Sequence, residues 1–248
     1  MLRPPAISGL LITGTDTEVG KTIVAAGIAD WFRRTGVRVG VFKPVATGCV
    51  KRREGLVSED AEFLAHCAGA RQPLDVICPQ RYVEPLAPAI AAERAKQPVD
   101  WDVIQRSLAV VEGNNDVLIV EGVGGLRVPI DEKHTFIDVA RWLNLPVVIV
   151  ARAGLGTINH TLLSIDALRA ANVEIAGVVI NRYPAESASI AEETNPRAIE
   201  KWGRVPVISI VPEYLAGIVG HLPADVVAAI ARADWMRFTR AGTSPSGH

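Results

Sequence analysis

The sequence has 248 residues, of which 49% are hydrophobic and 21% charged, enough to bury a sizeable core. Its 26 basic and 27 acidic residues leave a net charge of -1, so no long-range field attracts nucleic acid or an anionic membrane. These values exclude a protein that binds nucleic acid through a strongly basic surface. They predict one globular domain over residues 1–248, with a Gly/Ser/Pro-rich tail at 240–248 that we expect to be frayed.

Neither a membrane span nor a secretory signal is predicted. No apolar stretch approaches the ~20 residues that cross a bilayer, and the first residues, with Arg3 and two prolines before a short apolar run, are unlike a signal peptide. We therefore expect a cytoplasmic protein that binds no membrane. Cys49, Cys67 and Cys78 are odd in number and form no C-x-x-C pair, which argues against a disulfide framework and a zinc ribbon. We expect three reduced thiols without a catalytic role.

Short apolar runs alternate with helical patterns along the chain. Most runs are continuous, which is typical of strands covered on both faces of a parallel sheet. The predicted strands are 9–13, 37–42, 117–120, 147–150, 175–180 and 207–211, and the clearest helices are Lys21–Arg34, 101–111 after the cap-like Asp100, and 157–171. The irregular region 48–88 is expected to hold loops and short helices. The alternation predicts an α/β fold with a doubly wound, mostly parallel β-sheet flanked by helices.

The segment GTDTEVGKT at residues 14–22 joins the first predicted strand to the first helix. Its backbone N–H groups and the helix N-terminus suit phosphates, Lys21 supplies a charge, and the Thr22 hydroxyl can ligate Mg²⁺. Five residues separate Gly14 from Gly20, where the usual phosphate-binding loop has four. The alternative is a glycine-containing turn with a solvated lysine. Partition-type ATPases of this class carry an extra lysine where this chain has Asp16.

A lysine and a carboxylate follow two other predicted strands. Lys43 comes after 37–42 and Glu121 after 117–120, and both positions point to the crevice where doubly wound sheets bind ligands. Lys43 alone could be a solvated strand end. A carboxylate after four apolar residues is costly to bury without a cation, so Glu121 is a candidate Mg²⁺ ligand opposite Thr22. Asp60, on spacing alone, reads as a helix N-cap.

Four motifs together resemble dethiobiotin synthetases: GTDTEVGKT at 14–22, KPVATG at 43–48, EGVGG at 121–125 and LGTINH at 155–160. The resemblance extends over residues 10–212. It implies a P-loop NTPase fold and an ATP-dependent ligase of biotin biosynthesis. Such an enzyme carboxylates 7,8-diaminononanoate with CO₂, through a carbamate and a carbamic-phosphoric anhydride, and closes the ureido ring to give dethiobiotin, ADP and phosphate.

The resemblance also implies roles for individual residues around ATP. Lys21 and Lys43 are catalytic charges, Thr17 donates to the transferred phosphoryl group, and Glu18 meets the diamine. Thr22, Asp60 and Glu121 form the magnesium site, so for Asp60 the resemblance favours the metal over the cap. The implied nucleotide-binding residues are Glu18, Val19, Gly20, Lys21, Thr22, Asp60, Glu121, Gly122, Val123, Gly124, Asn181, Arg182, Val211, Pro212 and Glu213.

The substrate site is implied by two further segments. Thr47 would hydrogen-bond the diamine or carbamate, and the helix start with Gly156 and Asn159 would bind the substrate carboxylate through free N–H groups. In the family this site lies at a subunit interface, which implies a homodimer. A plain helix start with Asn159 as a polar first-turn residue is the alternative.

Two departures from the family pattern stand out. Arg182 follows Asn181, the implied purine-reading residue, where the family often has an acidic residue, so nucleotide selectivity is open. Arg127 stands where apolar residues are common, and the sequence provides no account of it.

Two other functions were weighed. An amidoligase of the cobyrinic acid type would carry a glutaminase domain with a nucleophilic cysteine, but all three cysteines lie before residue 80 and no such domain is expected. A partition-type switch ATPase is expected to have the extra loop lysine together with a basic face or an amphipathic tail. Asp16 and the net charge disfavour it.

Overall fold

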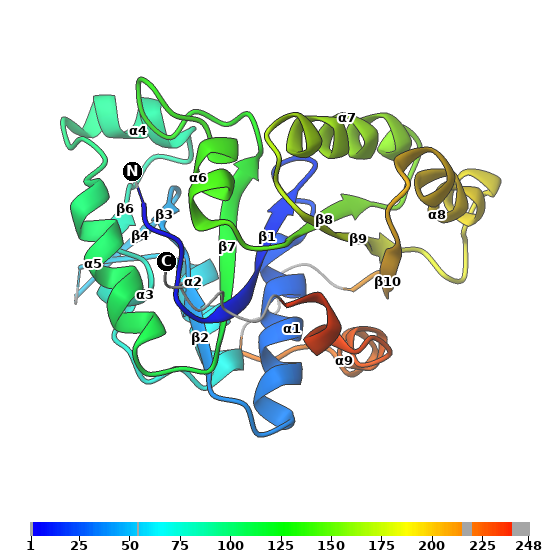
Figure 1. Ribbon diagram of the computed structural model, residues 1–248, viewed down its shortest axis with the longest axis horizontal. Helices are drawn as coiled ribbons and strands as arrows, with labels where there is room; N and C mark the ends of the chain where they lie inside the picture. The colour runs from blue at the N-terminus through cyan, green and yellow to red at the C-terminus, as the bar shows by residue number, and fades with distance from the viewer. Residues whose placement is uncertain (1, 54, 215–219, 240–248) are drawn as a thin grey trace, which may run out of the picture.

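A six-stranded parallel sheet with the order β10-β9-β8-β1-β7-β2 forms the centre of the molecule (Figure 1). The computed structural model describes residues 2–53, 55–214 and 220–239. The strands are β1 (Ser8–Gly14), β2 (Val39–Phe42), β7 (Val117–Gly125), β8 (Val147–Arg152), β9 (Ile175–Tyr183) and β10 (Val207–Pro212). All six predicted strands are present, and the predicted doubly wound α/β fold is confirmed.

Each strand differs from its predicted bounds at one end or both, by one to five residues, and the differences at β7 and β2 have clear causes. β7 does not end before Glu121 but continues through Gly125, because its glycine-rich end stays paired with β1 in the register Ile12↔Glu121 and Gly14↔Gly125. β2 begins at Val39 rather than at residue 37. The N–H of Val37 still donates to a carbonyl of the preceding helix, so this residue belongs to the turn.

Helices cover both faces of the sheet, so the core has two layers (Figure 1). One face packs against α1 (Lys21–Arg34), α2 (Glu59–Ala68), α3 (Leu74–Ile77), α9 (Ala224–Ile230) and the 3₁₀ turn η1 (Trp235–Phe238). The other face packs against α4 (Pro88–Ala95), α5 (Trp101–Glu112), α6 (Phe136–Leu143), α7 (Thr157–Ala170) and α8 (Ile190–Gly203). Apolar contact on both faces explains why the strands read as continuous hydrophobic runs.

The three predicted helices agree with α1, α5 and α7 to within one residue at each end. Asp100 is confirmed as the cap of α5, since its carboxylate accepts from the N–H groups of Asp102 and Val103. The helices α4, α6, α8 and α9 were not predicted individually. Pro196 interrupts the pattern inside α8, and α4, α6 and α9 are each at most eight residues long.

The region 48–88 holds the expected short helices and, in addition, short strands. It holds α2, α3 and an antiparallel pair of short strands, β4 (Val50–Arg52) and β5 (Gly55–Val57). The two-residue strands β3 (Val45–Ala46) and β6 (Gln80–Arg81) pair in parallel beside them. The tail predicted at 240–248 lies outside the described residues.

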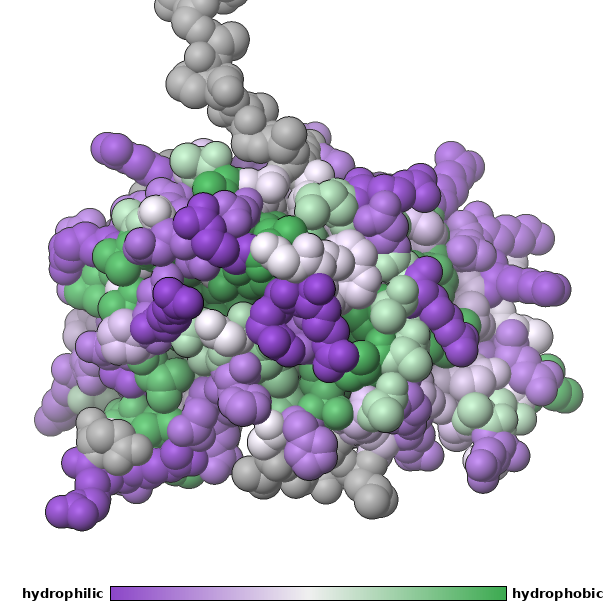
Figure 2. Space-filling model, turned by 90° about the horizontal axis from the view of Figure 1, so that it is seen from below, coloured by the Kyte–Doolittle hydropathy of each residue, from purple (hydrophilic) through white to green (hydrophobic). Residues whose placement is uncertain are grey.

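The surface seen from below mixes hydrophilic residues with hydrophobic residues that show between them (Figure 2). Among the described helices, none has both the length and the apolar character needed to cross a bilayer. Cys49, Cys67 and Cys78 are buried and unbonded to one another. Burial raises the pKa of Cys78 to about 12, which keeps this thiol protonated and supports a structural role.

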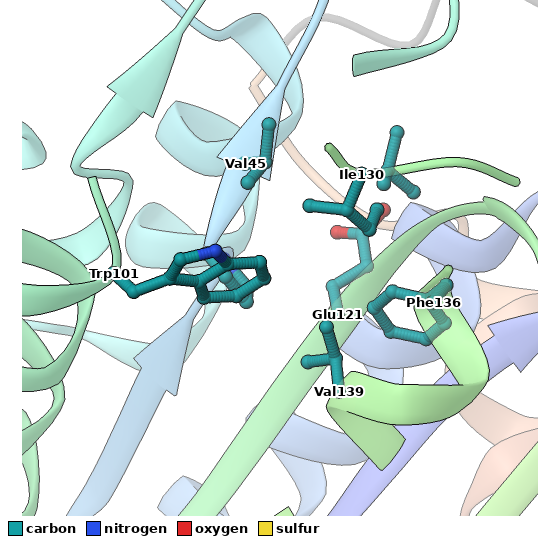
Figure 3. Close-up of a pocket in the computed structure, with 8 residues that line it drawn as sticks. Val45, Trp101, Glu121, Ile130, Phe136 and Val139 are labelled. Atoms are coloured by element: carbon teal, nitrogen blue, oxygen red, sulfur yellow. The ribbon is translucent and has the colours of Figure 1, made fainter. Parts of the chain in front are cut away.

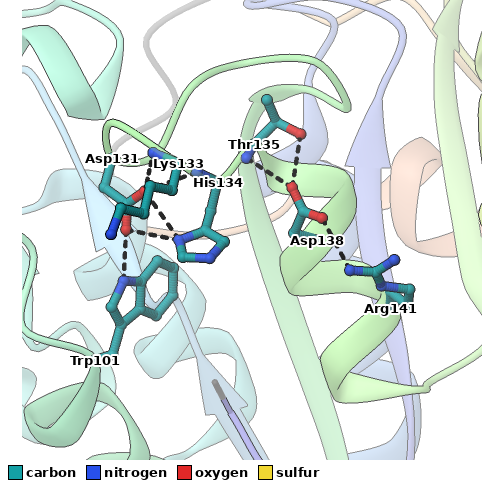
Figure 4. A network of polar contacts seen from close by, with 7 residues as sticks. All are labelled: Trp101, Asp131, Lys133, His134, Thr135, Asp138 and Arg141. Carbon is teal, nitrogen blue, oxygen red and sulfur yellow. Dashed lines mark hydrogen bonds and ion pairs between the residues drawn. The ribbon is translucent and has the colours of Figure 1, made fainter.

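A polar network fixes the connection between β7 and α6 (Figure 4). The Asp131 carboxylate accepts hydrogen bonds from Trp101 Nε1 at 2.7 Å and from the N–H groups of Lys133 and His134 at 2.8 and 2.7 Å. The His134 ring lies edge-on to Trp101 and Trp142, with ring centres 5.8 and 4.7 Å apart. Asp131 therefore ties the connection that follows the β7 glycines to the start of α5.

We predict that Asp131→Ala lowers the free energy of unfolding by about 2–3 kcal/mol, because four donors, the His134 ring among them, lose a charged acceptor. Burial alone would raise the pKa of Asp131, but hydrogen bonds from His134, Lys133 and Trp101 outweigh it and lower the pKa. The stabilisation is therefore complete above the ordinary carboxyl pKa and is lost as pH falls through the lowered one. Urea titrations at neutral and acidic pH should show the variant and the parent converging on acidification; a constant difference would contradict this account.

Candidate functional site

A cleft of about 1040 Å³ lies at the carboxyl ends of β1, β2 and β7. Its walls come from the loop between β1 and α1, the start of α2, the glycine-rich end of β7 and residues near the end of β10. A volume of this size accommodates a nucleotide together with a small substrate. The position agrees with the general rule that open α/β sheets bind ligands at the carboxyl edge.

The loop between β1 and α1 has the backbone of a phosphate-binding site. Lys21 Nζ donates to the carbonyl of Asp16 at 2.9 Å, so the lysine folds back across its own loop. Glu18 and Gly20 both have positive φ, 58° and 90°. A Cβ atom on Gly20 would lie 2.0 Å from Asn181 Nδ2, so glycine is required there for space as well as for conformation.

The ammonium group of Lys43 joins the two carboxylates of the site. Lys43 Nζ donates to Asp60 Oδ2 at 2.7 Å and to Glu121 Oε1 at 2.8 Å, and Thr22 Oγ1 donates to the same Glu121 oxygen at 2.7 Å. The four residues come from β7, the end of β2 and the first turns of α1 and α2. The cap interpretation of Asp60 is wrong, because Ser58 caps α2 and the Asp60 side chain faces Lys43.

Burial and charge act in opposite directions on these groups. Burial raises the pKa of Glu121 despite the nearby Lys43, since the side chain is only 1% exposed. Burial would lower the pKa of Lys43, but attraction from Glu121 and Asp60 outweighs it and holds this pKa above its ordinary value. The pKa of Asp60 is lowered, because Lys43 outweighs the effect of burial. Burial lowers the pKa of Lys21, and the charge of Lys43 adds to the effect.

Glu121 also borders a small apolar cavity on its other side (Figure 3). The cavity holds about 10 Å³, room for one water molecule at most, and its other lining side chains include Val45, Trp101, Ile130 and Phe136. Glu121 Oε2 is buried and has no hydrogen-bond partner among the described residues. A buried carboxylate oxygen in apolar surroundings is costly unless a cation or donor meets it.

Three oxygen-bearing side chains could therefore hold a divalent cation. Thr22, Asp60 and Glu121 all lie around one ammonium position, and Glu121 keeps a spare oxygen. In the part of the chain that the structure describes, no cluster of three or more His, Cys, Asp or Glu side chains forms a metal cage. Mg²⁺ does not need one, because it is held by one or two carboxylates together with water and substrate phosphates. The residues fit this kind of site.

Comparison with known proteins identifies the family. The sequence model of a family described as "AAA domain" matches residues 8–216. An ATP-dependent dethiobiotin synthetase of Haloferax mediterranei is 37% identical over 230 residues, which cover 90% of this chain and 95% of the relative. One of Bacillus cereus is 41% identical over 212 residues and 85% of each chain. The chain belongs to the dethiobiotin synthetase family.

Solved structures with the same fold are more distant than these family members. A chain of the MinC:MinD cell division protein complex of Aquifex aeolicus matches with a TM-score of 0.57 at 16% identity, over 90% of this chain and 93% of that chain. A ParA family ATPase of Chlorobium tepidum matches with a TM-score of 0.54 at 14% identity, over 92% and 98%. At such low identity the likeness shows the fold alone.

Most of the residues implied by the family motifs line the cleft. Those that do are Thr17, Glu18, Gly20, Lys21, Thr22, Lys43, Thr47, Asp60, Glu121, Gly122, Val123, Gly124 and Arg182. Val19 instead packs into the core beside α1, and Val211 is buried in β10. Gly156 and Asn159 lie at the exposed start of α7, outside the cleft of the same chain.

Asn181, for which the resemblance implies a contact with the purine, is fully buried. Its Nδ2 donates to the carbonyl of Val19 at 2.8 Å and to the hydroxyl of Tyr214 at 3.0 Å, so the side chain supports the phosphate loop from below. The Arg182 guanidinium lies 5.6 Å from the centre of the Tyr214 ring. The departure at Arg182 thus has a structural partner. Arg127 is exposed, and nothing in the structure explains it.

Sequence reasoning missed several cleft residues. Glu59, Glu62, Phe63 and His66 share one face of α2, and Tyr214 follows β10. The three- and four-residue spacing on α2 is a usable signal for a common face, once the helix is recognised. Tyr214 directly follows the implied nucleotide-binding residues Val211, Pro212 and Glu213, but no pattern singled out the tyrosine itself.

We predict that Glu121→Gln destabilises the fold by about 2–4 kcal/mol, because it removes one of the two charges that compensate the buried Lys43 ammonium. Glu62→Gln is the matched control. Glu62 pairs with Arg52 at the surface, with 45% of its side chain exposed, and its loss should cost less than about 1 kcal/mol. Equal urea midpoints for the two variants would show that the buried ion pair of Lys43 with Glu121 contributes no more to stability than the surface pair of Glu62 with Arg52.

Proposed function

We propose that this protein is an ATP-dependent dethiobiotin synthetase. It converts 7,8-diaminononanoate, CO₂ and ATP into dethiobiotin, ADP and phosphate, as a ligase of biotin biosynthesis. The observation that carries the proposal is the meeting of Lys21, Lys43, Thr22 and two carboxylates in one cleft of a chain that belongs to this family. These are the groups that phosphoryl transfer to a carbamate requires.

The proposed reaction proceeds in three steps. One amine of the diamine attacks CO₂ and loses a proton, which forms a carbamate. A carbamate oxygen then attacks the γ-phosphorus of ATP, and ADP leaves. The second amine attacks the carbonyl carbon of the resulting mixed anhydride and displaces phosphate, which closes the ureido ring.

The side chains supply charge and orientation in these steps. Lys21 and Lys43 place two ammonium groups where negative charge develops on the transferred phosphoryl group, which is the main source of catalysis in phosphoryl transfer. Thr17 donates a hydrogen bond to the same group. Glu18 attracts the free amine of the diamine, and Thr47 orients the carbamate. All five side chains line the cleft, which supports these assignments.

Mg²⁺ is the proposed metal, held by Thr22, Asp60 and Glu121. When bound with ATP it neutralises charge on the phosphate oxygens. The unpartnered Oε2 of Glu121 supports this assignment, because it is an acceptor of the kind that Mg²⁺ prefers. Lys43 shares both carboxylates and is thereby held beside the phosphate loop.

ATP is proposed to bind along the loop and the neighbouring strand ends. The phosphates meet the backbone of Glu18, Val19, Gly20, Lys21 and Thr22 and of Gly122, Val123 and Gly124, with Asp60 and Glu121 beside them. The base lies toward Asn181, Arg182, Val211, Pro212 and Glu213. The exposed guanidinium of Arg182 beside the Tyr214 ring leaves the choice of base open to experiment.

A homodimer is proposed because the substrate-carboxylate site is separate from the cleft. Gly156 and Asn159 begin α7 at an exposed position, so a second copy can reach them. The free N–H groups of the first helical turn suit a carboxylate. We also propose that residues 1–248 act as a single domain and that the protein works in the cytoplasm.

The rival functions have less support. Asp16 occupies the position of the partition-type lysine, and its carboxylate is paired with Arg152 at 2.9 Å. The likeness to MinD and ParA concerns the fold alone. An amidoligase would need a nucleophilic cysteine, but the three cysteines are buried and the pKa of each thiol is raised by burial.

We predict that Lys21→Gln reduces turnover by on the order of 10²-fold or more, because one preorganised charge on a phosphoryl transition state contributes ~3 kcal/mol. The measurement is incorporation of labelled bicarbonate into an acid-stable product in the presence of ATP and the diamine. Lys51→Gln, an exposed lysine outside the cleft, is the control and should keep normal turnover. Normal turnover of Lys21→Gln at saturating ATP would refute the phosphate-loop assignment.

We predict that Asn159→Asp raises the KM of the diamine about tenfold and leaves ATP affinity unchanged. An acidic residue in the first turn favours the helix, so folding is preserved, while its charge repels the substrate carboxylate. A diamine whose carboxylate is replaced by a neutral amide is the control substrate, and its KM should be the same for Asn159→Asp and the parent protein. An equal change for both substrates would place the carboxylate elsewhere.

Mixing variants tests whether two subunits share each site. In a heterodimer of Lys21→Gln and Asn159→Asp subunits, a shared site combines both lesions and leaves the second site intact. At diamine concentrations well below the parental KM, where Asn159→Asp alone works at about a tenth of the parental rate, an equimolar mixture that exchanges freely should recover roughly a quarter of the parental activity. If heterodimers form and the activity does not rise above that of the unmixed variants, the carboxylate site does not lie across the interface.

A further inference from the structure

The phosphate loop is tied to the neighbouring strand β8 by an ion pair between Asp16 of the loop and Arg152, a residue that lies outside the family motifs used above. Arg152, the last residue of β8, donates to Asp16 Oδ2 at 2.9 Å. Asp16 is the third residue of the loop segment 14–22, and the two partners are 136 residues apart in sequence. Both side chains are about half exposed, at 50% and 54%.

Asp16 holds the loop at three points. Its Oδ1 accepts from the N–H of Thr17 at 2.7 Å, and its backbone carbonyl accepts from Lys21 Nζ at 2.9 Å. Its second carboxylate oxygen is the one that Arg152 binds. A shift of Asp16 would therefore move the proposed phosphoryl donor Thr17 and the loop lysine together.

The other end of the pair is rigid. Arg152 ends a strand that is paired on both sides, with β1 and β9. The next two residues are held by a buried amide: Asn195 Nδ2 of α8 donates to the carbonyl of Ala153 at 2.7 Å and to that of Gly154 at 3.3 Å. Asn195 is only 4% exposed, so this contact is shielded from water. The guanidinium thus extends from a fixed backbone.

We propose that Arg152 is a positioning residue that acts through Asp16 to hold Thr17 and Lys21 of the phosphate loop in register with the β8–α7 connection. The same connection leads, four residues later, into the proposed carboxylate site at Gly156. In the proposed dimer the pair thereby links the ATP site of one subunit to the carboxylate site that the same chain contributes to its partner. This inference rests on the proposed function for its catalytic consequence, but its effect on ATP binding does not.

An exposed ion pair contributes little to stability, so stability and kinetics separate a positioning role from a structural one. Arg152→Ala should lower kcat by about tenfold and weaken ATP binding several-fold. The reason is that even a small displacement of catalytic groups lowers the reaction rate strongly. Arg152→Lys should restore most of the activity, since an ammonium can still meet Asp16. Arg38→Ala is the matched control: its pair with Asp116 is similarly exposed, but it lies at the amino ends of β2 and β7, at the opposite edge of the sheet.

A double-mutant cycle decides whether Arg152 acts through Asp16. Asp16→Asn keeps an acceptor for Thr17 and removes the charge that Arg152 binds. In that background Arg152→Ala should cause little further loss of kcat or ATP affinity. Independent losses that multiply would show that Arg152 acts on the ligands directly, and kinetics equal to those of Arg38→Ala would show a structural contact only. Either result overturns the proposal.

Measuring the ATP affinity of the Arg152 and Asp16 variants tests the positioning role of Arg152 independently of the synthetase reaction. Binding of ATP is measured by calorimetry without the diamine. If the parent protein released no ADP in response to the diamine, the proposed function would fail, whereas the ATP affinities of the Arg152 and Asp16 variants would still decide whether the pair positions the loop.

Discussion

The buried ammonium of Lys43 is the interaction on which the rest of the site depends. It is 3% exposed and contacts Asp60 and Glu121, which come from a helix on one face of the sheet and from a central strand. A single buried charge would cost several kcal/mol, but three charges with a shared hydroxyl satisfy one another. This requirement fixes the start of α2 against the ends of β2 and β7. The cleft is consequently formed before ATP arrives.

The elements around Lys43, Asp60 and Glu121 each contribute to the site in a different way. In the proposed complex with ATP, the loop after β1 faces the phosphates and the glycine-rich end of β7 keeps the backbone near them. The connection after β7 is held by Asp131 and three aromatic rings. The buried Asn181 donates to the carbonyl of Val19 in the loop, and we propose that Arg152 positions the loop through its ion pair with Asp16. Rigid support on several sides is what electrostatic catalysis of phosphoryl transfer demands, because the charges must be in place before the reaction.

Local patterns in the sequence were sufficient for the phosphate loop and the strands. The extent of α1 follows from its loop and its apolar spacing, and the six strands follow from their continuous hydrophobic runs. Lys43 and Glu121 were correctly placed at one edge because parallel strands all end there. The direct contact between Lys43 and Glu121 was not predicted, because it depends on β2 and β7 being neighbours in the sheet. No local sequence pattern specifies the order of the strands.

Long-range contacts account for what was missed. The metal role proposed for Asp60 came only from family resemblance, because α2 lies in a region expected to hold loops and short helices with no bounds given, and the structure shows that Ser58 is the cap. The pairing of Arg152 with Asp16 joins residues that no local pattern connects. The added length of β7 arose from continued pairing with β1, which overrides the low strand propensity of glycine.

The most direct test of the account is the dependence of ADP release on each substrate of the purified protein. ADP is measured with ATP, Mg²⁺, the diamine and bicarbonate together, and then with each omitted in turn. The account predicts one ADP per ureido ring formed and almost none when the diamine or bicarbonate is absent, because only a carbamate can accept the phosphoryl group. ADP release at the same rate without the diamine would contradict it and would indicate a switch ATPase instead.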